Sequence, residues 1–391
     1  MDSPITKQEN KRLLSLDILR GITIAGMILV NSPGSWSHIY APLQHTSWHG
    51  LTPTDLVFPF FVFMMGVSAY FSMRKFNFAP SRQTFQRIAK RTIIMFMLGI
   101  ALAWLALFMD GLFVGENILQ AATRFDQLRI PGVLQRLALA YGFSSLLILY
   151  TKDKKVIWAI TTLLLGYYII LLLGNGFERS INNIVGKVDR AVFGAQHLFR
   201  EYDIINEQVM PFDPEGLLGT IPTIAQVLIG FLFGQLIIQN KNNHTRVEKM
   251  LIWGTILLFS GLLLHYGCPM NKKLWTPTYV LATSGFAALL FGLLIWIIDI
   301  KGYDRWTKFF HSFGVNPLII YIFSGLIEIT AYSVRFTYKG DELLLKAFIF
   351  EHMLQPWAGN NFGSLLYALL VVLLSWLFGY TLYKRNIYIK I

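Results

Sequence analysis

Residues 13–73 read LLSLDILRGITIAGMILVNSPGSWSHIYAPLQHTSWHGLTPTDLVFPFFVFMMGVSAYFSM, and this stretch decides the fold. It holds two apolar runs, at about 13–31 and 55–73, and a bilayer span needs roughly 20 largely apolar residues. The connection between the runs has no Lys or Arg, yet it contains three His and two Trp. The pattern predicts two membrane helices joined by a chemically unusual loop.

The same alternation of apolar runs and short polar connections continues along the chain. Hydrophobic residues make up 54% of the 391 residues and charged residues only 14%, whereas a soluble domain carries about 25% charged residues. We therefore predict an all-α fold, a polytopic membrane helix bundle in which residues 1–391 form a single transmembrane domain. About ten transmembrane helices are expected, at about 13–31, 55–73, 92–109, 131–151, 156–173, 217–238, 250–265, 277–299, 309–332 and 363–383.

The distribution of basic residues predicts the orientation of the bundle. The net charge is +12, but Lys and Arg sit in short connections, which is typical of topology signals and excludes nucleic acid as a partner. With a cytoplasmic N-terminus, the cytoplasmic segments hold 21 Lys or Arg and the outer segments hold 11. Both termini are therefore expected in the cytoplasm, with 174–216 and 333–362 as extracytoplasmic loops. The apolar segment 343–357 is short for a span and is expected to be an interfacial or re-entrant helix.

Several features limit the chemistry that the chain can carry. Cys268 is the only cysteine, so an intrachain disulfide and a cysteine metal cluster are excluded, and no metal is expected. The first apolar run carries Asp17 and Arg20 and lacks a cleavage site, so it does not read as a signal peptide. Their spacing of three places both side chains on one face of a helix, where they can pair. This pair is either structural or part of a cofactor site.

The loop between the first two helices holds a set of side chains suited to acyl transfer. Histidine can accept a proton near neutral pH, and a carboxylate such as Asp55 can fix its tautomer. Asn31, at the end of the preceding helix, could donate a hydrogen bond to a thioester oxygen as charge develops there. From chemistry alone His38, His45 and His49 are equivalent candidates, and Asp55 could simply cap the second helix.

Other polar residues interrupt apolar runs or precede them. Gln135 and Arg136 lie in the fourth predicted helix, and a buried guanidinium needs an anionic partner such as a phosphate. Asn316, in the ninth, is either a polar helix contact or part of a cofactor site. The basic segment 74–91 can serve topology and lipid binding or contact the phosphates of a cytoplasmic nucleotide.

Two outer motifs, FDPEGLLGTIPTI (212–224) and CPMNKKLWTPTYVL (268–281), each lead into a helix. Asp213 and Glu215 could cap a helix N-terminus or face a substrate. Trp275 could be an interfacial anchor or a platform for a sugar ring.

At these residues the chain resembles the transmembrane heparan-α-glucosaminide N-acetyltransferases and their bacterial relatives. The resemblance is carried, in order, by SLDILRGITIAGMILVN, HTSWHGLTPTDLVFPFFVFMMGVS, IPGVLQRLALAY, DPEGLLGTIPTI, NKKLWTPTYVL and GVNPLIIY. It implies a multi-pass enzyme of the bacterial inner (cytoplasmic) membrane that moves acetyl from acetyl-CoA to the amine of a terminal glucosamine or related amino sugar. The chain departs from the family at His49, where an asparagine is usual.

The resemblance also implies roles for single residues. The family's catalytic histidine falls on His45, its aspartate on Asp55 and its asparagine on Asn31. The Gln–Arg pair linked with coenzyme binding falls on Gln135 and Arg136. We add Arg20 and Asn316 as cofactor-binding candidates, and expect the substrate-binding residues among Trp48, Trp275, Asp213 and Glu215.

The expected mechanism brings acetyl-CoA from the cytoplasm, with its pantetheine arm among the first, second and fourth helices and its acetyl group near His45. His45 acts either as general base in a direct transfer or through an acetylated intermediate. The expected partners are the amino-sugar or glycan acceptor and membrane lipid, with a homodimer as an alternative to a monomer. An amino-sugar transporter, a polysaccharide O-acetyltransferase and a scaffold without chemistry are the competing functions.

Overall fold

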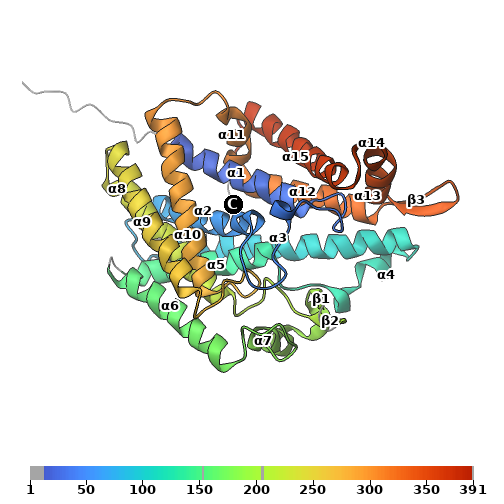
Figure 1. Cartoon of the computed structure of the whole chain (residues 1–391), viewed down its shortest axis with the longest axis horizontal. Helices are drawn as coiled ribbons and strands as arrows, with labels where there is room; N and C mark the ends of the chain where they lie inside the picture. Colours follow the sequence, from blue (N-terminus) through green and yellow to red (C-terminus); the bar gives the residue numbers. More distant parts are fainter. Residues whose placement is uncertain (1–12, 152–153, 204–206, 390–391) are drawn as a thin grey trace, which may run out of the picture.

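The computed structural model describes residues 13–151, 154–203 and 207–389, which form a bundle of long helices (Figure 1). The prediction of an all-α, polytopic membrane fold is confirmed. Nine described helices are long and apolar enough to cross a membrane, and the bent pair α11–α12 supplies a tenth if it counts as one span. The predicted cytoplasmic segment 1–12 lies outside the described residues, as do residues 152–153 and 390–391, and the orientation of the bundle stays a prediction.

The long helices agree with the predicted spans except at their ends and at the ninth span, which two helices cover. They are α1 (Leu14–Asn31), α2 (Val57–Arg74, preceded by the 3-10 turn η2, Pro53–Leu56), α3 (Arg82–Val114), α5 (Val133–Tyr150), α6 (Lys154–Leu173), α8 (Thr220–Gln239), α9 (Asn243–Leu264), α10 (Pro277–Leu294, continued by the π-helix η5, Ile295–Ile300), α11 (Thr307–Val315), α12 (Pro317–Ser333) and α15 (Asn360–Lys384).

Shorter elements occupy the connections. The helical ones are η1 (Ala41–Leu43), α4 (Ile118–Ala122), η3 (Phe125–Gln127), α7 (Ile184–Phe193), η4 (Ala195–His197), α13 (Leu345–Ala347), the π-helix η6 (Phe348–Leu354) and α14 (Gln355–Ala358). Two antiparallel hairpins, β1 (Arg200–Asp203) with β2 (Gln208–Pro211) and β3 (Arg335–Tyr338) with β4 (Asp341–Leu344), were not predicted. The segment expected as a short helix at 343–357 is helical from Leu345 to Ala358.

Burial divides the long helices into an inner and an outer group. In α1, α2, α5, α8 and α10, between 61% and 72% of the residues in the apolar window are buried. In α3, α6, α9 and α15 the share is only 11% to 33%, which leaves long apolar faces for lipid. The buried polar residues considered below therefore lie mainly on the inner group.

Glycines let helices of the bundle approach each other closely. A Cβ on Gly66 of α2 would lie 2.0 Å from the carbonyl oxygen of Val227 on α8. A Cβ on Gly21 of α1 would lie 1.9 Å from the carbonyl oxygen of Phe310 on α11. Small residues at such crossings are typical of helix packing in membranes, where backbone proximity replaces hydrophobic attraction.

The ninth predicted span, 309–332, is broken into two helices. The axes of α11 and α12 meet at 90°, and the break falls at Asn316 and Pro317. Asn316 has φ −126° and ψ 51°, which is not helical. Pro317 has no backbone N–H to continue the ladder of α11, but it suits the first position of α12. A continuous helix was therefore the wrong expectation here.

Three connections meet at one end of the bundle, which we call the loop end: 32–52, 174–219 and 265–276. The indole N–H of Trp48 donates to the carbonyl of Phe177 at 2.8 Å, and the N–H of Gly50 donates to the carbonyl of Met270 at 2.9 Å. Figure 1 shows α7 and the β1–β2 hairpin side by side beyond the helix ends, on this side of the bundle. The His- and Trp-containing loop is thus packed against two other connections.

Candidate functional site

Asp55 lies in η2, where the chain enters α2. Pro53 occupies the first turn of the helix, and Thr52 precedes it as cap. One carboxylate oxygen of Asp55, Oδ2, accepts the backbone N–H of Thr52 at 3.1 Å, which completes a capping box. The hydroxyl of Thr52 lies 2.9 Å from the same oxygen. The capping role weighed from the sequence is therefore present, and it uses only one of the two oxygens.

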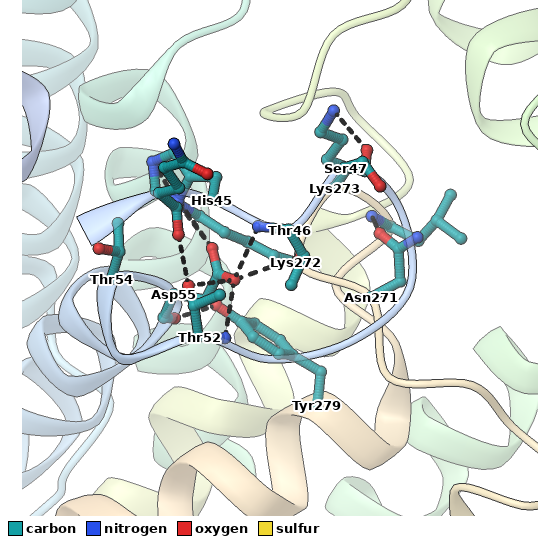
Figure 2. Close-up of polar contacts among 12 residues, drawn as sticks. His45, Thr46, Ser47, Thr52, Thr54, Asp55, Asn271, Lys272, Lys273 and Tyr279 are labelled. Atoms are coloured by element: carbon teal, nitrogen blue, oxygen red, sulfur yellow. Dashed lines mark hydrogen bonds and ion pairs between the residues drawn. The ribbon is translucent and has the colours of Figure 1, made fainter. Parts of the chain in front are cut away.

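The other carboxylate oxygen of Asp55 faces His45. Oδ1 lies 2.7 Å from His45 Nδ1; the Asp55 side chain is 0% exposed, whereas that of His45 is 31% exposed (Figure 2). Tyr279 of α10 donates its hydroxyl to the backbone carbonyl of Asp55 at 2.6 Å and anchors the turn. With the carboxylate ionised, Nδ1 carries the ring proton of a neutral His45, and Nε2 is left as the acceptor.

His45 and Asp55 line a cavity of about 470 Å³, which we call the loop-end cavity. Its wall also contains Asn31, Trp36, Glu215, Lys272 and Trp275, so α1 and three connections contribute to it. Predicted catalytic residues from positions 31, 45 and 55 thus share one cavity, as the acyl-transfer interpretation requires. Their catalytic roles stay predictions.

The three loop histidines, equivalent by chemistry, have different surroundings. His45 is the one that contacts Asp55 and lines the loop-end cavity. His38 lines a small separate pocket and lies with its ring centroid 6.4 Å from that of Phe350. His49 lies beside Trp48, with its Nδ1 3.4 Å from the amide nitrogen of Asn271, and burial lowers its pKa. The geometry favours His45, the residue that the family resemblance selects.

Lys272 is a site residue that sequence reasoning did not single out. Its Nζ lies 3.0 Å from His45 Nδ1, 3.3 Å from His45 Nε2 and 3.6 Å from Asp55 Oδ1. Burial lowers the pKa of this amine, although the carboxylates of Asp55 and Glu215 oppose the change. A signal was present in the sequence, because two adjacent lysines in a connection predicted to lie on the outer side run against the charge distribution of membrane proteins.

Two of the residues predicted to bind substrate lie in the wall of the loop-end cavity, Trp275 and Glu215. Trp275 is only 1% exposed, and its indole N–H donates to Gln226 at 3.0 Å. Trp36, which was not predicted, lines the same cavity and is 55% exposed. Its indole N–H donates to the hydroxyl of Tyr332 at 3.0 Å. Trp36 is therefore better placed than Trp275 to offer a ring face to a sugar.

The other two residues predicted to bind substrate are held by protein groups. Trp48 is buried beside Phe212, with ring centroids 5.4 Å apart. Asp213 is fully buried and accepts two hydrogen bonds from Arg129, at 2.7 and 2.8 Å. Arg129 also contacts Glu215 at 2.7 Å, and so connects Asp213 to the wall of the loop-end cavity.

Arg136 and Gln135 lie in the first turn of α5, near the loop end. Arg136 is 1% exposed, donates to the carbonyl of Gly216 at 2.9 Å and stacks over Trp275. Among the described residues its Nε and Nη1 have no hydrogen-bond partner. Gln135 packs over Gly99 of α3. Both residues lie behind the wall of the loop-end cavity rather than toward the opposite end of the bundle.

Arg20 belongs to a second cavity, of about 350 Å³, which we call the mid-bundle cavity. Arg20 donates to the carbonyl of Gly314 at 3.1 Å and lies 3.6 Å from Asp17, so the predicted pair on α1 exists. The cavity is also lined by Ser68, Ser72 and Arg91. Within the described part of the chain, the Nε of Arg91 is buried without a hydrogen-bond partner.

The two cavities follow the same three helices, α1, α2 and α5. Along α2, Val57 and Phe58 line the loop-end cavity, and the mid-bundle cavity begins one turn later at Phe61. Along α5, the corresponding residues are Val133 and Leu137. The combined length from Val57 to Ser72 is about 22 Å at 1.5 Å per residue. The two cavities together supply apolar walls and two cations, an arrangement that suits an elongated ligand with an anionic end at Arg20 and Arg91.

Asn316, the remaining cofactor candidate, binds the chain's own C-terminal segment. Its amide donates to the carbonyl of Ile387 at 2.8 Å, and its oxygen accepts the N–H of Ile389 at 2.9 Å. The neighbouring Pro317 lines the mid-bundle cavity. The alternative of a structural polar contact therefore describes Asn316 in this structure.

Comparisons with known proteins agree with the resemblance drawn from the motifs. Residues 12–112 match a family described as a domain of unknown function, DUF5009. The chain is 28% identical to the heparan-alpha-glucosaminide N-acetyltransferase of Homo sapiens over 97% of its length and 60% of the relative's. It is 27% identical to the Mus musculus protein of the same name, over 99% of the chain and 62% of the relative. The chain thus spans about 60% of the length of these relatives, and the predicted resemblance is confirmed.

Proposed function

We propose that this protein is a membrane acetyltransferase that moves an acetyl group from acetyl-CoA to the amine of a terminal glucosamine or a related amino sugar. The names of the two relatives support the reaction class. The observation that carries the proposal is the 2.7 Å contact between His45 and the buried Asp55 in a cavity that also contains Asn31. We place the protein in the cytoplasmic membrane of a bacterium, with the loop end on the outer side.

In this proposal His45 removes the proton that the sugar amine must lose. Asp55 holds the ring through Nδ1, so that Nε2 can accept the proton, and it stabilises the imidazolium that forms. Burial of Asp55 beside the half-exposed ring keeps this orientation fixed. His45 then returns the proton to the sulfur of the leaving thiol.

Asn31 interacts with the negative charge on the acyl donor. Its amide lies at the end of α1 in the wall of the loop-end cavity, where it can donate to the thioester oxygen as negative charge develops. One such donor contributes about 3–4 kcal/mol to a transition state in enzymes that use an oxyanion hole. Trp36 and Glu215, which line the same cavity, would bind the sugar through its ring face and its hydroxyl or ammonium groups.

The coenzyme would be held by both cavities. Arg20 and Arg91 would hold its phosphates, and the apolar wall between Phe61 and Val57 would hold its flexible arm. Bound there, it supplies the activated acetyl group. Arg136, which lies near the loop end, would then act on the wall around Trp275 and not on the nucleotide.

The test uses purified protein in detergent with acetyl-CoA and glucosamine, following free thiol and N-acetylglucosamine together. Wild-type protein should release one thiol for each sugar acetylated, and His45→Ala should lose both signals. His38→Ala is the matched control, since His38 lines a different pocket and should leave both unchanged. Uptake of glucosamine into liposomes without thiol release would support a transporter and contradict the proposal. Acetyl ester formation without amide would support O-acetylation instead.

The same preparation distinguishes direct transfer from an acetylated His45. Rapid mixing with labelled donor and no sugar should leave no hydroxylamine-sensitive label on the protein if transfer is direct. A labile label at His45 that forms at the rate of turnover would establish the two-step route.

A further inference from the structure

A lysine amine already occupies the place beside the proposed base. Lys272 Nζ lies within 3.3 Å of both ring nitrogens of His45, and its side chain is only 18% exposed. Figure 2 shows that the side chain of Lys272 extends past Thr46 toward His45. A sugar amine that loses its proton to His45 must approach the same ring. Lys272 therefore presents a primary amine where the acceptor amine is expected.

The next residue offers an internal comparison. Lys273 lines the same cavity, but its Nζ donates to the carbonyl of Ser47 at 3.0 Å and pairs with Glu201. In Figure 2 it extends toward Ser47, away from His45. Two adjacent lysines thus differ in one respect that matters for acyl transfer, their access to the base.

The state of the Lys272 amine also suits a nucleophile. Only the neutral amine attacks a thioester, and burial lowers the pKa of Lys272, although Asp55 and Glu215 oppose the change. His45 lies close enough to receive a proton from the attacking nitrogen.

We propose that Lys272 is an internal acetyl acceptor, which the enzyme acetylates on Nζ when donor is bound and no sugar occupies the loop-end cavity. This inference rests on the proposed function, since it needs the acetyl thioester beside His45. The Nζ lone pair forms a bond to the carbonyl carbon, and the carbon–sulfur bond breaks. One proton moves from Nζ through His45 to the thiolate, so the products are Nε-acetyl-lysine and the free thiol.

Acetylation of Lys272 would close the site to further turnover. The amide has no charge, so the contact with Asp55 at 3.6 Å would no longer join a cation to a carboxylate. The added acetyl group would also fill space beside His45. The sugar amine and Lys272 then compete for one acetyl group, and the enzyme limits itself when acceptor runs out while acetyl-CoA remains.

The test incubates the purified protein with deuterated acetyl-CoA, with and without glucosamine, and maps deuterated acetyl-lysine by peptide mass spectrometry. Label should accumulate at Lys272 and not at Lys273, and glucosamine should suppress it. His45→Ala should slow labelling of Lys272 by about 100-fold, the usual contribution of a general base. Lys273→Arg should keep the label at Lys272, and Lys272→Arg should lose it without transferring it to Lys273. Because an amide resists hydroxylamine, the label is distinct from an acetylated His45.

Sugar acetylation by wild-type protein, measured in the same samples, separates the two proposals. Acetylated glucosamine with unlabelled Lys272 would overturn the inference and leave the function standing. Neither product from folded protein would overturn the proposed function. Equal labelling of Lys272, Lys273 and exposed lysines, or labelling unaffected by His45→Ala, would indicate uncatalysed chemistry and also overturn the inference.

Discussion

Two buried aspartates at the loop end, Asp55 and Asp213, resemble each other in position and differ in their partners. Each side chain is 0% exposed, and each precedes a long helix of the inner group. Asp213 is bound by Arg129 through two hydrogen bonds and accepts the backbone N–H groups of Phe199 and Glu215 at 3.0 Å. Asp55 faces His45 and Lys272, which both line a cavity.

The partners decide what each carboxylate can do. Arginine stays protonated at any pH a protein experiences, so the Arg129–Asp213 pair can hold the fold but cannot exchange a proton. Histidine changes charge near neutral pH, so the pair of His45 and Asp55 can do both. Burial alone identifies neither function, because both carboxylates are equally buried.

The largest effect is expected when the His45–Asp55 pair is converted into a copy of the Arg129–Asp213 pair. His45→Arg places a permanent cation against Asp55, so the ion pair should survive while proton transfer is lost. Acetylation of glucosamine should fall by about 10²- to 10⁴-fold, the contribution of a general base, and the melting temperature in detergent should stay close to wild type. Residual activity within tenfold of wild type would show that His45 is not the base.

The converse substitution should affect stability rather than chemistry. Burial raises the pKa of Asp213, but the hydrogen bonds and charge of Arg129 outweigh it, so this pKa is lowered overall. In Arg129→His the imidazole can form the charged pair only when protonated. The charged pair should stabilise the fold at pH values below about 6.5, the ordinary pKa of histidine. This stabilisation should be lost as the pH rises through the pKa of the imidazole in the folded state, which the pair raises.

We expect Arg129→His to be less stable than wild type by about 2–3 kcal/mol at pH 8, with part of the loss recovered near pH 5.5. Thermal unfolding at the two pH values measures the difference, and Arg129→Lys, which stays charged throughout, is the control. A loss of stability that does not depend on pH would contradict the pairing argument.

A third buried aspartate, Asp189 of α7, extends the comparison to a carboxylate without a strong partner. One oxygen accepts the N–H of Leu217 at 2.8 Å, and among the described residues the other has no hydrogen-bond partner. Burial raises its pKa from 3.8 to about 6. The folded state therefore binds a proton more tightly than the unfolded state, and stability should fall as the pH rises from about 4 to about 6.

Asp189→Asn keeps the acceptor for Leu217 and removes the charge. The variant should be more stable than wild type at pH 7, by about 1–2 kcal/mol, because the desolvation of a carboxylate no longer opposes folding. The pH dependence between 4 and 6 should shrink with it. Melting temperatures at pH 4 and pH 7 test both statements. A variant that is less stable than wild type at pH 7 would show that other groups of the folded protein compensate the charge of the Asp189 carboxylate.

Most of the fold could be predicted because its signals are local. Ten apolar runs of the right length are visible without knowledge of any contact, and the long helices agree with them. The break at Asn316 was missed because a single Pro inside an apolar run permits either a kinked helix or two helices, and a contact with Ile387, 71 residues later, accompanies the break. The two hairpins lie in polar connections, where no hydrophobic period marks a strand.

The site could be predicted in part. Asn31 and Asp55 flank the His-containing loop, so their proximity follows from two neighbouring helices. The choice among three histidines did not follow from chemistry, because it depends on how the loop folds back on η2. Lys272 was missed for the same kind of reason, since the chain brings it to His45 from 227 residues away. Tertiary contacts between loops carry no pattern that periodicity can reveal.

The smallest effect concerns the second oxygen of Asp55. Thr46 approaches Oδ2 with its hydroxyl at 3.3 Å and its N–H at 3.4 Å, while Thr52 donates from closer positions. Thr46→Ala removes one long hydrogen bond and leaves the capping box intact, so acetylation should fall by about two- to fivefold, equivalent to about 1 kcal/mol or less. Thr46→Ser restores the hydroxyl and should restore the rate. If Thr46→Ala instead matched His45→Arg in its effect, Asp55 would be held for catalysis mainly by Thr46, and the two oxygens would not divide capping and chemistry between them.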